Sequence, residues 1–368
     1  MFHRRREEGK RFAVKLCGLL LLIAWQALSP GSVPGQSGRR SAAASDKAAA
    51  PNAAGTQQEQ EAAADVLRVR TEEVLLPVSV RDWSGTNVNG LNRDNFIVYD
   101  EGVRQQIRSF NRHRVPANIV LLLDASGSVF QQMRFIRKAA KGFVEGLLPE
   151  DKVCVVQFAD RVELLQDWTA ASQPQALEKA LDWRYHPGES TTFYDGLYLA
   201  AEDQLKKVEG RRIIILLTDG IDTAERKRAG FKDALNAIRS AEASVYVVSL
   251  TGMLREMLLR RTGGRVRQNL LRGYDPQQVG RYLKLIDDAE KQLAGLATQT
   301  GGRIFLPLKD EDLSTAYTAI AEELRAQYII TYKPDPPVAS GEWRRVRVLV
   351  LPGGYEVAAR EGYTGREH

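Results

Sequence analysis

The sequence predicts an α/β protein in which a doubly wound, mostly parallel sheet is flanked by a small antiparallel β module. Between residues 117 and 327, apolar runs of strand length alternate with amphipathic helical patterns, as in parallel sheets covered by helices on both faces. Outside this region, short apolar segments are separated by turns rich in Gly, Asn and Pro, which is typical of antiparallel strands. The length of 368 residues allows two or three domains.

The elements of the α/β region follow one another in a regular order. Five apolar runs are predicted strands: Ile119–Leu123, Val153–Phe158, Ile213–Leu217, Val245–Leu250 and Ile304–Leu306. Six predicted helices lie between or after them: Gln131–Leu148, Gln175–Trp183, Thr192–Val208, Ala229–Ala241, Leu283–Thr300 and Glu311–Gln327. We place this domain at residues 116–327, a β-rich N-terminal module at 66–115 and a C-terminal β segment at 328–368. The two flanks are expected to pair with each other, so that the α/β domain is inserted in one β module.

The N-terminus has the features of an export signal. The basic stretch 2–11 precedes an apolar run, Leu16–Leu28, which is shorter than the roughly 20 residues of a membrane span. Residues 1–28 are therefore a signal peptide, or an uncleaved anchor as the alternative. Residues 29–65 are rich in Ala, Ser, Gly, Pro and Gln and form a predicted disordered linker. We expect an exported protein, periplasmic, in the cell envelope or extracellular, that meets a membrane only through an uncleaved N-terminal segment.

Composition excludes several classes of function. The hydrophobic content of 43% is ordinary for a globular protein. The formal net charge is +6, and residues 1–28 contribute +4 of it. Seven arginines lie in a basic insertion at about 251–282, which could be a docking arm or a solvated amphipathic helix. A general phosphate-binding surface, and with it a nucleic-acid partner, is not expected. The cysteines and histidines show no zinc spacing.

Oxygen-bearing side chains gather where three predicted elements meet the same edge of the sheet. Asp124, Ser126 and Ser128 directly follow the first strand, and Asp219 follows the strand that ends at Leu217. A third loop, 188–192, precedes a predicted helix and carries adjacent threonines. Ligands bind at the carboxyl ends of strands in open α/β sheets. Oxygen donors without His or Cys select Mg²⁺, Mn²⁺ or Ca²⁺, so the pattern predicts a hard-cation site.

This order of motifs resembles the von Willebrand factor type A domain and its metal-ion-dependent adhesion site. The family has Asp-x-Ser-x-Ser after the first strand, a Thr before a central helix and an Asp after a later strand. The resemblance implies a Rossmann-like fold and a metal touched directly by Ser126, Ser128 and Thr191, with Asp124 and Asp219 acting largely through bound water. Thr192 is the alternative to Thr191. The Gly-Gly that often precedes this Thr is replaced here by the sequence of residues 188–190, Gly-Glu-Ser, which puts the loop path in doubt.

The segments on either side of the α/β region resemble, more specifically, those of exported bacterial proteins of the Acidobacteria type that carry this domain. Residues 81–85 read Arg-Asp-Trp-Ser-Gly, residues 95–102 read Asn-Phe-Ile-Val-Tyr-Asp-Glu-Gly, and the chain closes on a Gly-Tyr pair at 362–363. The resemblance implies a sandwich-like β module beside the α/β domain, and it defines no molecular role.

These observations favour a metal-dependent protein-binding or adhesion module over an enzyme. The cation, Mg²⁺ in the first instance with Mn²⁺ or Ca²⁺ as alternatives, would ligate a carboxylate of a protein partner. A structural or regulatory envelope component with a fold-stabilising metal is the alternative. A phosphoester hydrolase is disfavoured, because a nucleophilic Asp124 would need a second acid where Ser126 stands and no histidine pairs with Ser126 in the sequence pattern.

Overall fold

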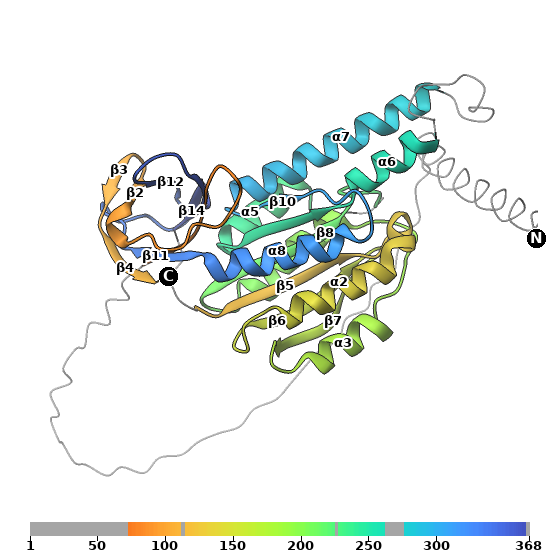
Figure 1. The fold of residues 1–368 in the computed structure, drawn as a ribbon, viewed down its shortest axis with the longest axis horizontal. Helices are drawn as coiled ribbons and strands as arrows, with labels where there is room; N and C mark the ends of the chain where they lie inside the picture. The colour runs from red at the N-terminus through yellow and green to blue at the C-terminus, as the bar shows by residue number, and fades with distance from the viewer. Residues whose placement is uncertain (1–72, 112–114, 225–226, 262–275, 366–368) are drawn as a thin grey trace, which may run out of the picture. The chain divides into compact units, whose positions relative to one another are not determined.

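The computed structural model describes residues 73–111, 115–224, 227–261 and 276–365 (Figure 1). The predicted signal and linker, and residues 262–275 of the basic insertion, lie outside the described residues. Within the described part, no helix is both long and apolar enough to cross a bilayer.

The α/β region is built on a six-stranded sheet with the order β10-β9-β8-β5-β6-β7. The first five strands in this order are parallel, and β7 runs antiparallel to β6 at the edge. The central strands are aliphatic and buried on both faces, which explains their nearly continuous apolar sequence. The strands are β5 (Ala117–Asp124), β6 (Lys152–Phe158), β7 (Val162–Ala170), β8 (Arg211–Thr218), β9 (Ser244–Ser249) and β10 (Ile304–Phe305).

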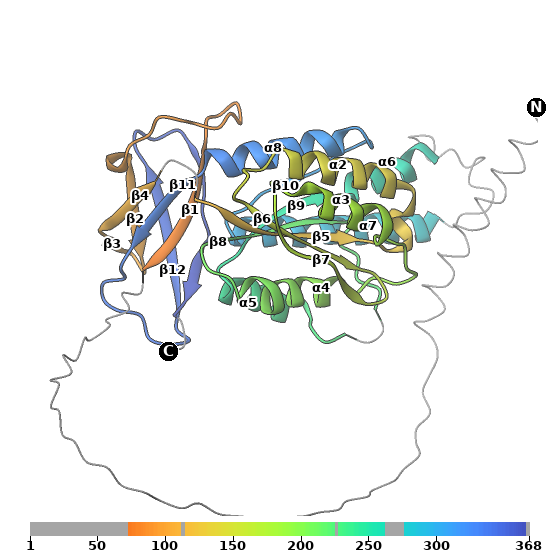
Figure 2. The same ribbon diagram turned by 90° about the horizontal axis from the view of Figure 1, so that it is seen from below.

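Helices cover both faces of this sheet, as the sequence predicted (Figure 2). One face packs against α2 (Met133–Glu145), α3 (Pro174–Trp183), α6 (Thr251–Arg261) and α8 (Asp312–Ala326). The other packs against α4 (Phe193–Leu199), the π-helical segment Ala200–Leu205, α5 (Phe231–Ser240) and α7 (Pro276–Gln299). Two short 3-10 helices occupy Arg93–Asn95 and Gly127–Gln132.

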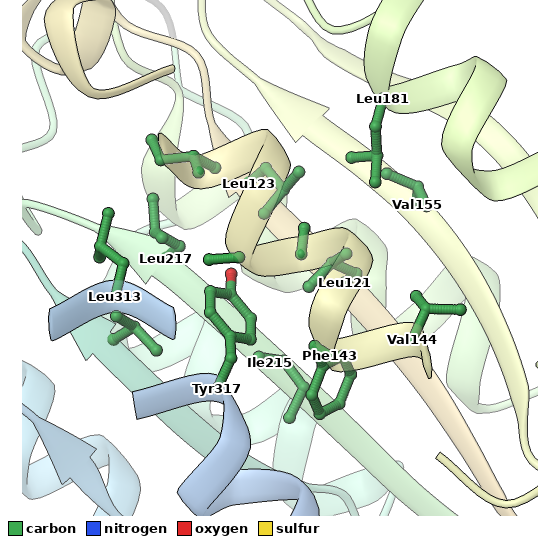
Figure 3. Packing of buried hydrophobic residues seen from close by; sticks show 14 of the residues in the cluster. Leu121, Leu123, Phe143, Val144, Val155, Leu181, Ile215, Leu217, Leu313 and Tyr317 are labelled. Carbon is green, nitrogen blue, oxygen red and sulfur yellow. The ribbon is translucent and has the colours of Figure 1, made fainter. Parts of the chain in front are cut away.

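The core on the α8 face contains a buried tyrosine. Figure 3 shows the Tyr317 ring inside the cluster, with its hydroxyl directed toward the leucines of β5 and β8. The ring packs against Phe143 of α2 at a centroid distance of 5.5 Å. Its hydroxyl has no hydrogen-bond partner among the described residues. The same cluster contains the buried Tyr185 and Tyr246. Their hydroxyls form hydrogen bonds, so Tyr317 differs from them.

Three local features differ from the sequence prediction. Strand β7 was not predicted, because its residues alternate only weakly between buried and exposed positions. The helix expected over 192–208 is α-helical only to Leu199 and then widens, with the Lys206 N–H donating to the Ala201 carbonyl five residues back. Helix α7 begins at Pro276 instead of Leu283, which places the end of the basic insertion inside this helix.

The flanking segments form two four-stranded antiparallel sheets with the orders β13-β1-β11-β4 and β14-β12-β2-β3. Strands from before and after the α/β region pair directly: β1 with β11, and β2 with β12. The predicted small β module from the two flanks is therefore confirmed. Its strands are β1 (Val74–Arg81), β2 (Phe96–Asp100), β3 (Val103–Gln105), β4 (Ile107–Asn111), β11 (Tyr328–Tyr332), β12 (Trp343–Val350), β13 (Glu356–Ala358) and β14 (Gly362–Thr364).

A buried polar network joins the β module to the α/β region. The guanidinium of Arg81, on β1, contacts the carboxylate of Glu323, on α8, at 2.8 Å. Arg211, the first residue of β8, donates to the Leu324 carbonyl at 3.0 Å and to the Gln327 side chain at 2.6 Å. Helix α8 passes directly into β11 at this point. The β module is thus attached at the amino ends of the parallel strands, opposite to their carboxyl edge.

Candidate functional site

The two aspartates of the predicted site lie side by side at the carboxyl edge of the sheet. Asp124 ends β5, and Asp219 directly follows the last residue of β8. Strands β5 and β8 are parallel neighbours, with Leu123 opposite Leu217. Residues 124 and 219 are therefore brought to the same point of the edge, and both are buried. The sequence predicted that both aspartates lie at this edge, and the structure adds that their strands are direct neighbours.

The carboxylate of Asp124 is fixed by hydrogen bonds on both oxygens. Its Oδ1 accepts from the Ser126 main-chain N–H at 2.8 Å. Its Oδ2 accepts from the Thr218 hydroxyl at 2.6 Å. The hydroxyl of the buried Tyr185 donates to the Asp124 main-chain carbonyl. Residue 124 is thus held in one geometry from three separate elements.

The two serines extend the site as a continuous row of oxygens. The hydroxyls of Ser126 and Ser128 share a hydrogen bond of 2.9 Å. The Ser128 hydroxyl in turn donates to Asp219 Oδ2 at 2.6 Å. The Ile221 N–H donates to the other Asp219 oxygen at 3.0 Å. The structure therefore brings Asp124, Ser126, Ser128 and Asp219 together as the motif predicted.

The threonine loop is tied to this edge through its main chain. The Thr191 N–H donates to the Thr223 hydroxyl at 2.9 Å, and the Thr191 carbonyl accepts from the Thr223 N–H at 3.1 Å. The Gly188 N–H donates to the Ala125 carbonyl at 2.8 Å. Thr191 and Thr192 are both buried, and the Thr192 hydroxyl has no hydrogen-bond partner among the described residues. Among the described residues, no hydrogen bond joins the Thr191 or Thr192 hydroxyl to the row of serine and aspartate oxygens, so the choice between the two threonines stays a prediction.

A carboxylate that the sequence analysis missed sets the path of this loop. Asp160 Oδ1 accepts from the main-chain N–H and the hydroxyl of Ser190, at 2.8 and 2.9 Å. It also accepts from the Glu189 N–H at 3.1 Å. The main-chain bond from Ser190 comes first among the causes that lower the pKa of Asp160. Asp160 follows β6 by two residues, so the same rule of acids after strand ends could have found it.

Two further aspartates near the edge serve as turn-forming residues. Asp195 Oδ1 accepts from the N–H groups of Arg228 and Ala229, at 2.9 and 2.8 Å. Asp222 accepts from the Ala224 N–H at 3.1 Å and pairs with Lys227 at 3.1 Å. Their hydrogen-bonding capacity is used within the protein itself.

The pKa values of Asp124 and Asp219 are raised, whereas that of the nearby Asp160 is lowered. Burial raises the pKa of Asp124 to about 7, and the nearby Asp219 carboxylate adds to the rise. Burial also raises the pKa of Asp219. Among the ion pairs of the described residues, none involves either carboxylate. The site is a buried concentration of carboxylate and hydroxyl oxygens, and no cationic side chain of the described residues pairs with it.

The donor set fits a hard divalent cation. Two carboxylates and several hydroxyls supply oxygen alone, the donors that Mg²⁺, Mn²⁺ and Ca²⁺ prefer. The described residues contain no group of three or more His, Cys, Asp or Glu side chains placed to hold a metal. A site in this protein would therefore depend on hydroxyl ligands as well as carboxylates.

Comparison with known proteins identifies the α/β region. Residues 118–273 match the model of the von Willebrand factor type A domain. The chain thus contains this domain, with its Rossmann-like α/β fold, as the sequence resemblance implied. The chain is also 32% identical over 109 residues to the uncharacterized protein sll0103 of Synechocystis sp., a match that covers 29% of this chain and about a quarter of that protein (26%).

Solved structures with a similar arrangement come from several sources. Proximal thread matrix protein 1 from the mussel byssus is 16% identical with a TM-score of 0.43, and the match covers 61% of this chain and 51% of that one. A von Willebrand factor type A protein from Catenulispora acidiphila is 12% identical with a TM-score of 0.41, covering 82% and 76%. The pilus adhesin SpaC from Lactobacillus rhamnosus GG is 10% identical with a TM-score of 0.42, covering 74% and 47%.

Proposed function

We propose that the carboxyl edge of the sheet holds a divalent cation, Mg²⁺ in the first instance, through Ser126, Ser128 and Thr191. Asp124 and Asp219 would act largely through bound water. The observation that carries this proposal is the adjacent pair of buried carboxylates without a cationic side chain. Burying two like charges is costly unless a counter-charge neutralises them. A bound cation supplies that charge and uses the hydroxyl row that connects the pair.

The bound ion would serve protein recognition. An ion whose direct ligands are neutral hydroxyls keeps much of its positive charge, and a carboxylate from a partner protein is a suitable further ligand. Catalysis has little support, since the His186 side chain is exposed and forms no hydrogen bond with Ser126 among the described residues. We therefore propose a metal-dependent interaction or adhesion module, exported as its flanking motifs and N-terminal segment suggest, in the bacterial periplasm, envelope or outside the cell.

Calorimetric titration of Mg²⁺, Mn²⁺ and Ca²⁺ into the full chain tests the metal site. We expect saturable binding of Mg²⁺ by the wild type and its loss in Ser128→Ala and Asp219→Asn. Asp94→Asn is the matched control, because Asp94 is an exposed carboxylate of the β module. Equal binding by all four proteins would place the ion elsewhere and refute the site.

Partner binding is tested separately once the metal site is established. Affinity capture from envelope extracts should recover a protein ligand with Mg²⁺ present and lose it with chelator or in Asp219→Asn. Esterification of the recovered ligand's carboxylates should also abolish binding. Retention of the same ligand after chelation would reject metal-dependent recognition. Metal binding that raises thermal stability, with no ligand recovered under any condition, would favour the alternative, an envelope component in which the ion stabilises the fold.

A further inference from the structure

The outward face of the sheet β14-β12-β2-β3 presents unpaired arginines around apolar groups. Residues of β2 and β12 alternate between the buried core and the surface, as expected of a sheet with one solvated face. The surface positions carry three exposed arginines, Arg104 on β3 and Arg345 and Arg347 on β12. This face lies outside the α/β region and shares no residue with the candidate metal site.

Strand register aligns these residues in two rows. Arg347 lies opposite Tyr99, and Tyr99 lies opposite Arg104, so that the tyrosine stands between two arginines on adjacent strands. In the next row, Leu349 lies opposite Ile97. Neighbouring strands are about 4.8 Å apart, which separates the attachment points of the two arginines by roughly 10 Å. Directly opposite residues share one face of the sheet.

The three exposed arginines of this face have no acidic partner among the described residues. Among the described residues, the side chains of Arg104, Arg345 and Arg347 take part in no ion pair or hydrogen bond. The nearby acid, Glu101, accepts from the main-chain N–H of Arg345 at 2.5 Å. By contrast, the inward-pointing Arg344 is paired with Glu342 at 3.1 Å. The face therefore carries guanidinium groups whose hydrogen-bonding capacity remains available.

Each end of the first row opens into a hollow of the surface. A cavity of about 460 Å³ is lined by residues that include Ile97, Arg104 and one acid, Asp94. A second cavity, of about 470 Å³, is lined by residues that include Arg347, Leu349 and one acid, Glu361. A linear ligand lying across Tyr99 would thus meet an apolar group and a guanidinium in the hollow on either side.

We propose that this face binds an acidic linear glycan of the uronic acid type. Tyr99, Ile97 and Leu349 offer apolar surface to sugar rings, and the planar guanidinium of an arginine matches a carboxylate in a bidentate way. Arginines about two strands apart match alternate carboxylates of such a polymer. Two other anionic partners fit less well. The side chains of Tyr99, Ile97 and Leu349 are half-buried, and the Trp343 ring at the far end of β12 is covered by Arg239. These positions do not favour insertion into a bilayer, and one tyrosine provides no platform for successive nucleobases.

Binding of the full chain to immobilised polygalacturonate tests this proposal, with neutral dextran as the reference surface. We expect binding that weakens with salt and survives both chelator and Asp219→Asn. The double variant Arg104→Ala/Arg347→Ala should bind about tenfold more weakly or worse, given the usual strength of hydrogen bonds to charged groups. Since both side chains are exposed, the variant is expected to keep its melting temperature.

The control removes the same charge from other exposed surfaces. Arg108→Ala/Arg134→Ala replaces an exposed arginine of β4 and one of α2 and should leave the affinity within about twofold, since unpaired surface charges contribute little. An equal loss in both double variants would show a non-specific charge effect and overturn the proposal. Absence of binding to polygalacturonate at low salt would overturn it as well. Tighter binding to poly-glutamate or to phosphatidylglycerol vesicles would assign the face to a different partner class.

Discussion

Two of the places where the described residues bury carboxylates differ in which groups face the negative charge. At the junction with the β module, Glu323 contacts the guanidinium of Arg81 at 2.8 Å and the hydroxyl of Tyr246 at 3.2 Å. At the carboxyl edge of the sheet, the hydrogen bonds that Asp124 and Asp219 accept from the described residues come from hydroxyl and main-chain N–H groups. A buried carboxylate that is paired with a cationic side chain, as Glu323 is, helps to hold the two parts of the fold together. A buried pair without such a partner lowers stability, and this cost is the physical basis for proposing that the pair binds a cation.

The largest expected effect comes from breaking the paired site. Arg81→Met removes the guanidinium that lies between Glu323 and Glu356. Because the Glu323 side chain is only 1% exposed, its charge would lose its principal compensation. We expect the free energy of unfolding to fall by about 3 kcal/mol. Denaturant unfolding measures this, with Arg345→Met, an exposed arginine without a side-chain partner, as the control.

A loss below about 1 kcal/mol in Arg81→Met, no larger than a usual surface change, would contradict the comparison. Arg303, which lies 3.6 Å from Glu323, would then provide sufficient compensation. The double variant Arg81→Met/Arg303→Met distinguishes that case.

The unpaired site should respond in the opposite direction. Asp124→Asn removes a buried charge while keeping the shape and the acceptor for the Ser126 N–H. In metal-free buffer at pH 8 we expect the free energy of unfolding to rise by on the order of 1 kcal/mol. The same variant should show no stabilisation by Mg²⁺. Destabilisation of the metal-free variant would show that the hydrogen bond from Thr218 to Oδ2, which asparagine cannot accept at that atom, outweighs the cost of the buried charge.

The dependence of folding stability on pH tests whether the buried charge of Asp124 is destabilising. Because burial raises the pKa of Asp124 to about 7 from its usual 3.8, the folded state holds a proton more tightly than the unfolded state. Between about pH 4 and pH 7 this group makes the stability of the metal-free protein fall as pH rises. Unfolding curves of wild type and Asp124→Asn should therefore converge below about pH 4 and separate through pH 7, with Asp94→Asn following the wild type.

A smaller effect distinguishes the two candidate threonines. Thr192→Val removes a buried hydroxyl that has no partner among the described residues, and we expect it to raise stability by about 1 kcal/mol with Mg²⁺ affinity unchanged. Thr191→Val should instead weaken Mg²⁺ binding about tenfold or more, because it removes a direct ligand. Calorimetry on the two variants measures both effects. Loss of Mg²⁺ binding in Thr192→Val alone would transfer the ligand role to Thr192.

Sequence order was sufficient to predict much of the candidate site. Strand ends in a parallel sheet meet at one edge, so residues 124 and 219 could be brought together before their contacts were known. The pairing of the two flanks was also predictable, because both carry antiparallel patterns around an inserted domain. Both inferences depend on the order of strands and helices along the chain, which the periodicity of apolar residues indicates.

Contacts that depend on side-chain reach were not predictable. Nothing in the sequence connects Arg81 with Glu323, residues 242 positions apart, because the partners of a buried charge are set by packing. Strand β7 was missed since an edge strand has little alternation to detect. The basic face of the β module required knowledge of register, because a shift of one residue would point Arg104 and Arg347 into the core.

The smallest expected effect concerns two buried tyrosines, one whose hydroxyl has a hydrogen-bond partner and one whose hydroxyl has none among the described residues. The Tyr185 hydroxyl donates to the Asp124 carbonyl, whereas the Tyr317 hydroxyl has no partner among the described residues. Tyr317→Phe should therefore raise the free energy of unfolding by about 0.5 kcal/mol, and Tyr185→Phe should lower it by about 1 kcal/mol. Denaturant unfolding of the two variants measures these changes. Both variants remove the same hydroxyl group, so opposite changes in the free energy of unfolding would isolate the contribution of the hydrogen bond. A loss of stability in Tyr317→Phe would reveal a partner for that hydroxyl, such as a buried water.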